Sequence, residues 1–169
     1  MKQSEAWGDA SITGSAVAPT PEPQTRMPAR MTAISPAELG ESPGWTHGWL
    51  APAGARLLFV AGQTASNAQG RFTSARFVDQ FDAALAKVLL VVAAAGGMPE
   101  HIVRMTVYVT DVDAYLASRK EIGQAWRRQM ARHYPAMALV EVTRLVERDA
   151  VVELEVTAAV PPPPEDARG

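Results

Sequence analysis

Two glutamates alternate with apolar residues near the end of the chain, in the segment Val151-Val152-Glu153-Leu154-Glu155-Val156. Because successive side chains of a strand point to opposite faces, this pattern predicts a strand that carries Glu153 and Glu155 on one face. A carboxylate beside a substrate can orient water or transfer a proton. The same side chains can instead form ion pairs with Arg144 or Arg148 on a solvated face.

A second predicted strand follows His133-Tyr134-Pro135, and its alternate residues Met137, Leu139 and Glu141 share a face. This face is apolar apart from one carboxylate. A thioether has no hydrogen-bond donor to offer an anion. This face therefore offers an anion little to bind apart from water and backbone groups.

Metal and cofactor chemistry are not expected. The chain has no cysteine, which excludes disulfides, thiolate catalysis and cysteine metal ligands. Its three histidines, His47, His101 and His133, are scattered without the spacing of metal ligands. No glycine-rich phosphate-binding loop of either usual spacing is present, so we predict no bound cofactor.

The charge and hydropathy patterns exclude two classes of partner. Sixteen basic and eighteen acidic side chains give a net charge of -2, without a basic block, so we expect no nucleic-acid partner. The longest apolar run, residues 88–95, is far shorter than the roughly 20 residues that span a bilayer. The N-terminus has no secretory signal pattern. We expect a cytoplasmic protein that does not contact membranes.

The length of 169 residues and the hydrophobic fraction of 47% fit one domain. Residues 1–30 are rich in Gly, Ser, Thr and Pro without a lasting period, and we predict a flexible N-terminal arm. Residues 31–160 carry the periodic pattern of a core. Residues 161–169 form a proline-rich tail that ends the last strand, because proline cannot donate to a ladder.

Helical spacing of apolar residues predicts a long helix over about 75–95, with Gly96-Gly97 as its stop. A second helix is predicted over about 114–132, capped by Asp111 or Asp113.

Strands are predicted before, between and after these helices. Residues 45–50 and 57–61 are expected to pair as a hairpin across Pro52-Ala53-Gly54, and Ile102–Val109 alternates like a half-buried strand. This order predicts an α+β fold, with both helices on one face of a mixed sheet. The other face needs a cover, for which a subunit partner is the simplest candidate.

Several motifs occur in an order typical of one protein family. They are Gly48 after Trp45-Thr46-His47, then Ala61-Gly62-Gln63, Thr106-Val107-Tyr108-Val109-Thr110-Asp111, the segment from Tyr134-Pro135-Ala136 to Val140-Glu141-Val142, Arg144-Leu145 and Val152-Glu153-Leu154-Glu155. On these motifs the chain resembles the RidA/YjgF/YER057c/UK114 family over about residues 33–159.

The resemblance implies a chorismate-mutase-like fold, assembled as a homotrimer around a central β-barrel with pockets between subunits. In such a pocket an arginine after Tyr-Pro-Ala holds the carboxylate of a 2-iminoacid or 2-aminoacrylate. A glutamate orients the water that attacks the imine carbon, and ammonia and a 2-oxoacid leave.

The chain departs from this pattern at the arginine, where Met137 stands instead. Ala61 replaces a frequent hydroxyl, and Leu139 a frequent cysteine. A guanidinium meets a carboxylate with two charge-assisted hydrogen bonds, which a thioether cannot supply. The implied pocket is therefore more apolar than is usual in the family, while Glu153 matches the catalytic glutamate and is the candidate acid–base residue.

Other residues are candidates for binding on the same resemblance. Gly62 belongs to the implied substrate site, with Gln63 and Glu141 as positioning or structural residues. Trp45 and His47 occupy the place of a substrate-covering tyrosine loop, where Trp45 can stack on a planar ligand and His47 can titrate or simply lie at the surface.

Arg119 is the one candidate replacement for the missing arginine. The resemblance places it near the pocket mouth of a neighbouring subunit, where its long side chain can return a guanidinium to the site. Alternatively, it is a solvent-exposed helix residue on the face of Arg127 and Arg128.

Three functions fit these residues. The first is a deaminase that hydrolyses a small imine or enamine with a hydrophobic character. The second is a pocket adapted to another reaction, such as a tautomerisation or a cyclisation. The third is a trimer that binds a ligand or acts as a scaffold without catalysis.

Overall fold

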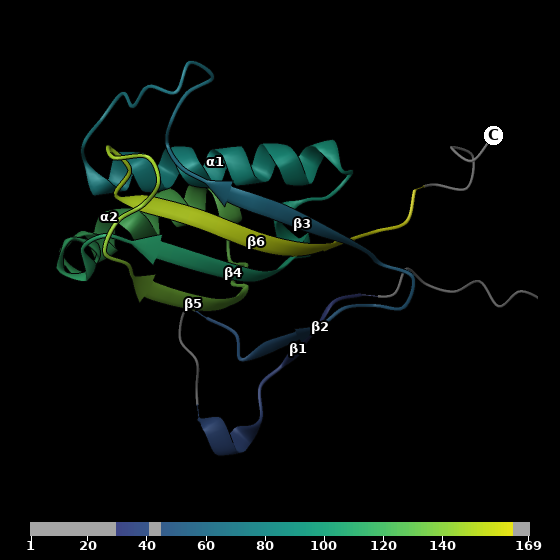
Figure 1. Ribbon diagram of the computed structural model, residues 1–169. Coiled ribbons are helices and arrows are strands. Elements are labelled where there is room, and N and C mark those ends of the chain that lie inside the picture. Colours follow the sequence, from purple (N-terminus) through teal and green to yellow (C-terminus); the bar gives the residue numbers. More distant parts are fainter. Residues whose placement is uncertain (1–29, 41–44, 164–169) are drawn as a thin grey trace, which may run out of the picture.

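A computed structural model describes residues 30–40 and 45–163 (Figure 1). The arm predicted over residues 1–30 lies outside this part, apart from Arg30. The tail predicted over residues 161–169 is described as far as Pro163, and β6 ends at Val160, immediately before the prolines.

A four-stranded mixed sheet forms one layer, in the order β3-β6-β4-β5. Strand β6 is antiparallel to both of its neighbours, whereas β4 and β5 are parallel. The predicted mixed sheet is therefore confirmed, although the last strand is longer than expected. The strands are β3 (Arg56–Gln63), β6 (Val152–Val160), β4 (Ile102–Val109) and β5 (Ala136–Glu141).

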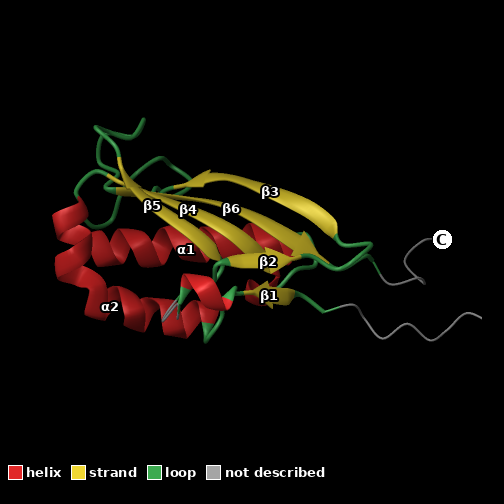
Figure 2. Cartoon of the chain, turned by 90° about the horizontal axis from the view of Figure 1, so that it is seen from below, coloured by secondary structure: helices red, strands yellow, loops and turns green. Residues whose placement is uncertain are grey.

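Helices α1 (Phe77–Ala94) and α2 (Val112–Met130) both cover the same face of this sheet, as predicted (Figure 2). The core lies between the two layers, where alternate strand residues meet the apolar stripes of the helices. Its largest fully buried side chains are Phe81, Leu85, Ile102, Met105, Met130 and Leu154.

The helix ends follow the predicted signals. The Asp111 carboxylate accepts a hydrogen bond from the Ala114 N–H at 2.9 Å, so Asp111 rather than Asp113 caps α2. Gly96 has a φ of +81°, and the Gly97 N–H donates to the Val92 carbonyl at 2.9 Å. A left-handed residue followed by this bond is a common way to end a helix.

The predicted hairpin of residues 45–50 with 57–61 is wrong. Strand β2 (Gly48–Leu50) pairs with the short strand β1 (Thr32–Ile34), which the sequence pattern did not reveal, and β3 pairs with β6 instead. The Trp49 indole N–H donates to the Tyr134 carbonyl at 2.9 Å. This bond holds β2 near the start of β5 and away from β3.

Arg56, the first residue of β3, links this strand to the end of α1 and to the segment after β6. Its guanidinium donates to the Ala95 carbonyl at the end of α1 and to the Pro161 carbonyl just after β6, at 3.0 to 3.2 Å. The chain therefore leaves the sheet in a defined place after β6.

The face of the sheet opposite the helices is bare in this single chain (Figure 2). Leu57 and Phe59, in the first half of β3, are 59% and 74% exposed. Large apolar side chains exposed within a strand are typical of surfaces that contact another molecule. We call this surface the open face.

Candidate functional site

A cavity of about 370 Å³ lies between α2 and the sheet. It brings together four of the candidate binding residues, since Trp45, Arg119, Met137 and Leu139 all line it. The remaining lining residues are Phe81, Val107, Tyr115, Ile122, Gly123, Trp126 and Tyr134. We call this the aromatic cavity.

The pairing of β5 with β4 directs Met137 and Leu139 into this cavity. Met137 pairs with Met105 and Leu139 with Val107, so their side chains lie on the helix-covered face. Glu141 continues the same alternation, which confirms the predicted shared face. Its carboxylate accepts a hydrogen bond from the Val112 N–H at 2.8 Å, so Glu141 supports the start of α2.

The aromatic side of the cavity is rigidly held. The Trp126 ring stacks on Tyr134 with centroids 5.7 Å apart and planes 5° apart. The Trp126 indole N–H donates to the His133 carbonyl at 3.0 Å, and the His133 ring nitrogen Nε2 lies 2.7 Å from the Ile102 carbonyl oxygen. His133 is therefore a buried structural residue.

Trp45 and His47 meet at the rim of the cavity. Their rings contact edge to face, with centroids 4.3 Å apart. Trp45 lines the cavity while remaining 43% exposed, and the buried Nε2 of His47 has no hydrogen-bond partner in the described part of the chain. His47 thus buttresses Trp45 and does not itself line the cavity.

Glu153 lies elsewhere, against Gly62 of the neighbouring strand β3. A Cβ atom at Gly62 would overlap the Oε1 atom of Glu153 and lie 2.7 Å from its carboxyl carbon. The absence of a side chain at Gly62 therefore makes room for the carboxylate. Gln63 closes the local bulge, because its amide donates to the Ala61 carbonyl at 3.1 Å. We call Ala61, Gly62, Gln63 and Glu153 the carboxylate half-site.

The carboxylate half-site and the aromatic cavity lie on opposite faces of the sheet. Glu153 pairs with Tyr108 on the open face, whereas Leu154 pairs with Val107 on the helix-covered face. One chain therefore cannot bring Glu153 to Met137. The two can share a ligand only across a boundary between subunits.

The predicted alternative, an ion pair of Glu153 or Glu155 with Arg144 or Arg148, is not seen in the described residues. Glu155 instead accepts a hydrogen bond from the Tyr108 hydroxyl at 2.9 Å. This bond raises the pKa of Tyr108, because deprotonation would place a phenolate beside a carboxylate.

A buried glutamine positions the start of β6. The Gln80 amide donates to the carbonyls of Ser74 and Asp149 at 3.0 and 2.8 Å and accepts from the Val151 N–H at 2.9 Å. All of its hydrogen-bonding groups are used, although Gln80 is only 1% exposed. The strand that carries Glu153 therefore begins at a fixed point.

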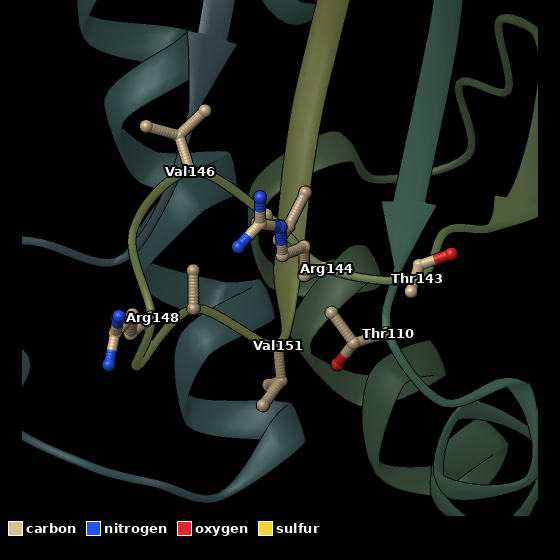
Figure 3. A pocket seen from close by; sticks show the side chains of 8 residues that line it. Thr110, Thr143, Arg144, Val146, Arg148 and Val151 are labelled. Carbon is tan, nitrogen blue, oxygen red and sulfur yellow. The ribbon is translucent and has the colours of Figure 1, made fainter.

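A second cavity, of about 670 Å³, lies along the loop that precedes β6. Figure 3 shows its lining side chains pointing in different directions, with the Arg144 and Arg148 guanidinium groups well apart. Val146, at the tip of this loop, is 99% exposed. The cavity does not gather its polar groups around one point and is not the stronger candidate.

Tyr115, Gly123 and Trp126 also line the aromatic cavity, although no motif marked them as site residues. Tyr115, Arg119 and Gly123 are four residues apart, a spacing that places them on one helix face. That spacing was the available signal.

In the described ranges, no three His, Cys, Asp or Glu side chains are grouped as metal ligands. The helices of the same ranges are all too short or too polar to cross a membrane.

Comparisons with known proteins agree on one family. Residues 48–160 match the family model described as Endoribonuclease L-PSP. A RutC family protein of Pasteurella multocida is 30% identical over 102 residues, which are 60% of this chain and 78% of that protein.

Solved structures of similar proteins share the fold. The Rid-family protein YyfB of Yersinia pestis has a TM-score of 0.68 and 26% identity, over 77% of this chain and 98% of YyfB. TdcF of Escherichia coli, solved with bound serine, has a TM-score of 0.55 and 28% identity, over 71% of this chain and 91% of TdcF. The chain therefore belongs to the Endoribonuclease L-PSP family, the YjgF/YER057c/UK114 or Rid proteins that its motifs resemble.

Proposed function

We propose that this protein hydrolyses a small imine or enamine in pockets between the subunits of a homotrimer. The proposal rests mainly on one observation: the Glu153 carboxylate lies on the open face of the sheet, whereas the aromatic cavity lies on the other face. Packing open faces together would cover Leu57 and Phe59 and bring the carboxylate half-site of one subunit to the aromatic cavity of the next.

The carboxylate half-site is suited to water activation. Glu153 has no hydrogen bond or ion pair in the described part of the chain, and its carboxylate occupies the space that a side chain at residue 62 would fill. As general base, Glu153 takes a proton from water while the oxygen attacks the imine carbon. As general acid, it passes that proton to the nitrogen, which gives a carbinolamine. The carboxylate then takes the proton of the new hydroxyl group and delivers it to the nitrogen, so that the C=O bond forms as the C–N bond breaks, leaving ammonia and a 2-oxoacid.

The aromatic cavity is suited to hold the substrate. TdcF, a relative solved with bound serine, supports a ligand that resembles an amino acid. The cavity has Met137 where an arginine is usual, so binding depends on apolar and aromatic contacts more than is common in the family.

The test is ammonia release from 2-iminoacids generated in situ by an amino-acid oxidase, with catalase present. We expect the protein to accelerate ammonia release above the spontaneous rate, and Glu153→Gln, added at the same concentration, to leave the spontaneous rate unchanged. Ammonia release at the background rate with every 2-iminoacid tried would contradict the proposal. RNA cleavage, which the family description names, is measured in parallel on single-stranded RNA, and we expect none.

A further inference from the structure

We infer that the aromatic cavity selects 2-iminoacids with an aromatic side chain, that Gly123 makes room for the ring, and that Arg119 holds the carboxylate. The inference rests on the proposed function, because it names the substrate class of the same site. It assigns a specificity role to Gly123 and a binding role to Arg119.

The size and lining of the cavity favour a flat, bulky group. Its volume of about 370 Å³ falls in the range of roughly 300–1,000 Å³ in which proteins bind drug-sized ligands. Five of its eleven lining residues are aromatic, whereas aromatic residues make up 7% of the chain. A three-carbon substrate would leave much of this surface without contacts, and such gaps forfeit dispersion energy.

The ring faces needed for stacking are already ordered. Trp126 is held by its stack on Tyr134 and its bond to the His133 carbonyl, and Trp45 is buttressed by His47. Aromatic pairs prefer offset-stacked or edge-to-face contacts, which rigid rings offer to a planar ligand without further ordering. Met137 adds a polarizable thioether, which also contacts ring edges favourably.

Gly123 is unusual because it lies inside α2, where glycine destabilises the helix relative to alanine. Neither packing nor backbone conformation explains it. A Cβ atom there would meet no heavy atom within 4 Å, and its φ is not in the left-handed region. Since Gly123 lines the cavity, the missing side chain becomes space for a ligand.

Arg119 lies one turn before Gly123 on the same helix face and lines the same cavity. The described residues give its guanidinium no hydrogen bond or salt bridge, whereas Arg128 of the same helix pairs with Asp82 at 3.1 Å. An unpaired guanidinium beside an apolar cavity fits a ligand with one anionic end. An aromatic 2-iminoacid fits both the cavity and Arg119, because its ring can fill the cavity while its carboxylate pairs with the guanidinium.

The test compares the binding of two 2-oxoacid products to the intact oligomer by isothermal titration calorimetry. We expect phenylpyruvate to bind at least tenfold more tightly than pyruvate. Gly123→Val should weaken phenylpyruvate binding at least tenfold, while its affinity for pyruvate stays within about twofold of the parent value. The phenylpyruvate affinity of Gly123→Ala should lie between those of the parent and Gly123→Val. Arg119→Met should weaken both ligands at least fivefold, and Arg119→Lys should restore part of the loss.

Thermal unfolding of each variant separates ligand effects from folding. Gly123→Ala is expected to fold at least as stably as the parent, so its ligand binding reports on the space in the cavity. Equal affinity for the two oxoacids, or phenylpyruvate binding unchanged by Gly123→Val, would overturn the inference. If the aromatic preference fails in this way but small 2-iminoacids are still hydrolysed, the proposed function is retained. Tight phenylpyruvate binding without ammonia release from any 2-iminoacid overturns the proposed function and keeps the ligand class.

Discussion

The two faces of the sheet differ in kind. The helix-covered face is apolar and holds a preformed cavity with Met137 and Leu139, whereas the open face carries Glu153, Glu155 and the exposed Phe59. One face holds a ligand-sized cavity, and the other holds the carboxylate that we propose as the acid–base group. This division shows that Glu153 and the cavity cannot meet within one chain, so the proposed site depends on contact between chains.

The largest expected effect is on turnover by Glu153→Gln, which keeps the size of the side chain and removes its charge. General acid–base groups contribute typically 10²–10⁴-fold, and we expect a loss of about that size in kcat with the 2-iminoacid assay. Glu155→Gln is the matched control on the same face, with an expected change below about threefold. A full rate for Glu153→Gln would exclude it as the base.

Mixing two inactive variants tests whether the site is shared. Glu153→Gln disables the carboxylate half-site, and Met137→Asp places a repelling charge in the aromatic cavity. When the two variants are mixed in equal amounts and assemble at random into trimers, about a quarter of the parent activity should return. In that fraction of interfaces an intact carboxylate half-site meets an intact aromatic cavity. Activity of the mixture no higher than that of the two variants alone would mean that both halves act within one chain.

Phe59→Asp tests the open face as the assembly surface. A charge at a covered apolar position is costly, so we expect smaller species by light scattering and at least a tenfold loss of ammonia release. Leu90→Asp is the control, because Leu90 is 69% exposed on α1, on the helix side. If both variants keep the parent's size and activity, the open face is not the contact.

A smaller effect is expected from Gly62→Ala, which displaces the Glu153 carboxylate without touching the aromatic cavity. We expect kcat to fall about threefold to tenfold, because catalytic groups must be held close to their productive position. Phenylpyruvate affinity and thermal stability should hardly change. Gly48→Ala, whose Cβ would meet Ile34 at an ordinary 3.8 Å, should leave kcat unaltered.

The smallest effect concerns Tyr108 and Glu155 on the open face. Their hydrogen bond raises the pKa of Tyr108 above its ordinary value of about 10. The bond therefore stabilises the folded protein below about pH 10, and this contribution is lost as pH rises through the raised pKa. Tyrosinate absorbance, compared with Tyr108→Phe, should show a late-titrating phenol that Glu155→Gln moves to lower pH.

Local signals were sufficient for much of the fold. The two helices followed from apolar spacing, and their ends from Asp111 and Gly96, because caps act within a few residues. The hairpin prediction failed because it relied on closeness along the chain. Long-range contacts, such as the bond from Trp49 to the Tyr134 carbonyl, place β2 beside β1 and β4 instead.

The candidate site was predictable only in parts. Alternation correctly put Met137, Leu139 and Glu141 on one face. Alternation shows which residues of one strand share a face, but it does not relate the faces of two separate strands. Only the sheet register shows that Glu153 of β6 and Met137 of β5 lie on opposite faces. Gly123 escaped notice because a glycine inside a helix has meaning only once the surrounding space is known.

The clamp that Arg56 makes on Ala95 and Pro161 has a practical use. It anchors the exit of the polypeptide at the far end of β6 from Glu153, about 23 Å away at the usual rise per residue. A fluorophore or an affinity handle joined to the chain beyond this clamp would be attached at the far end of β6. Immobilised or labelled protein should therefore keep the Glu153 carboxylate unobstructed.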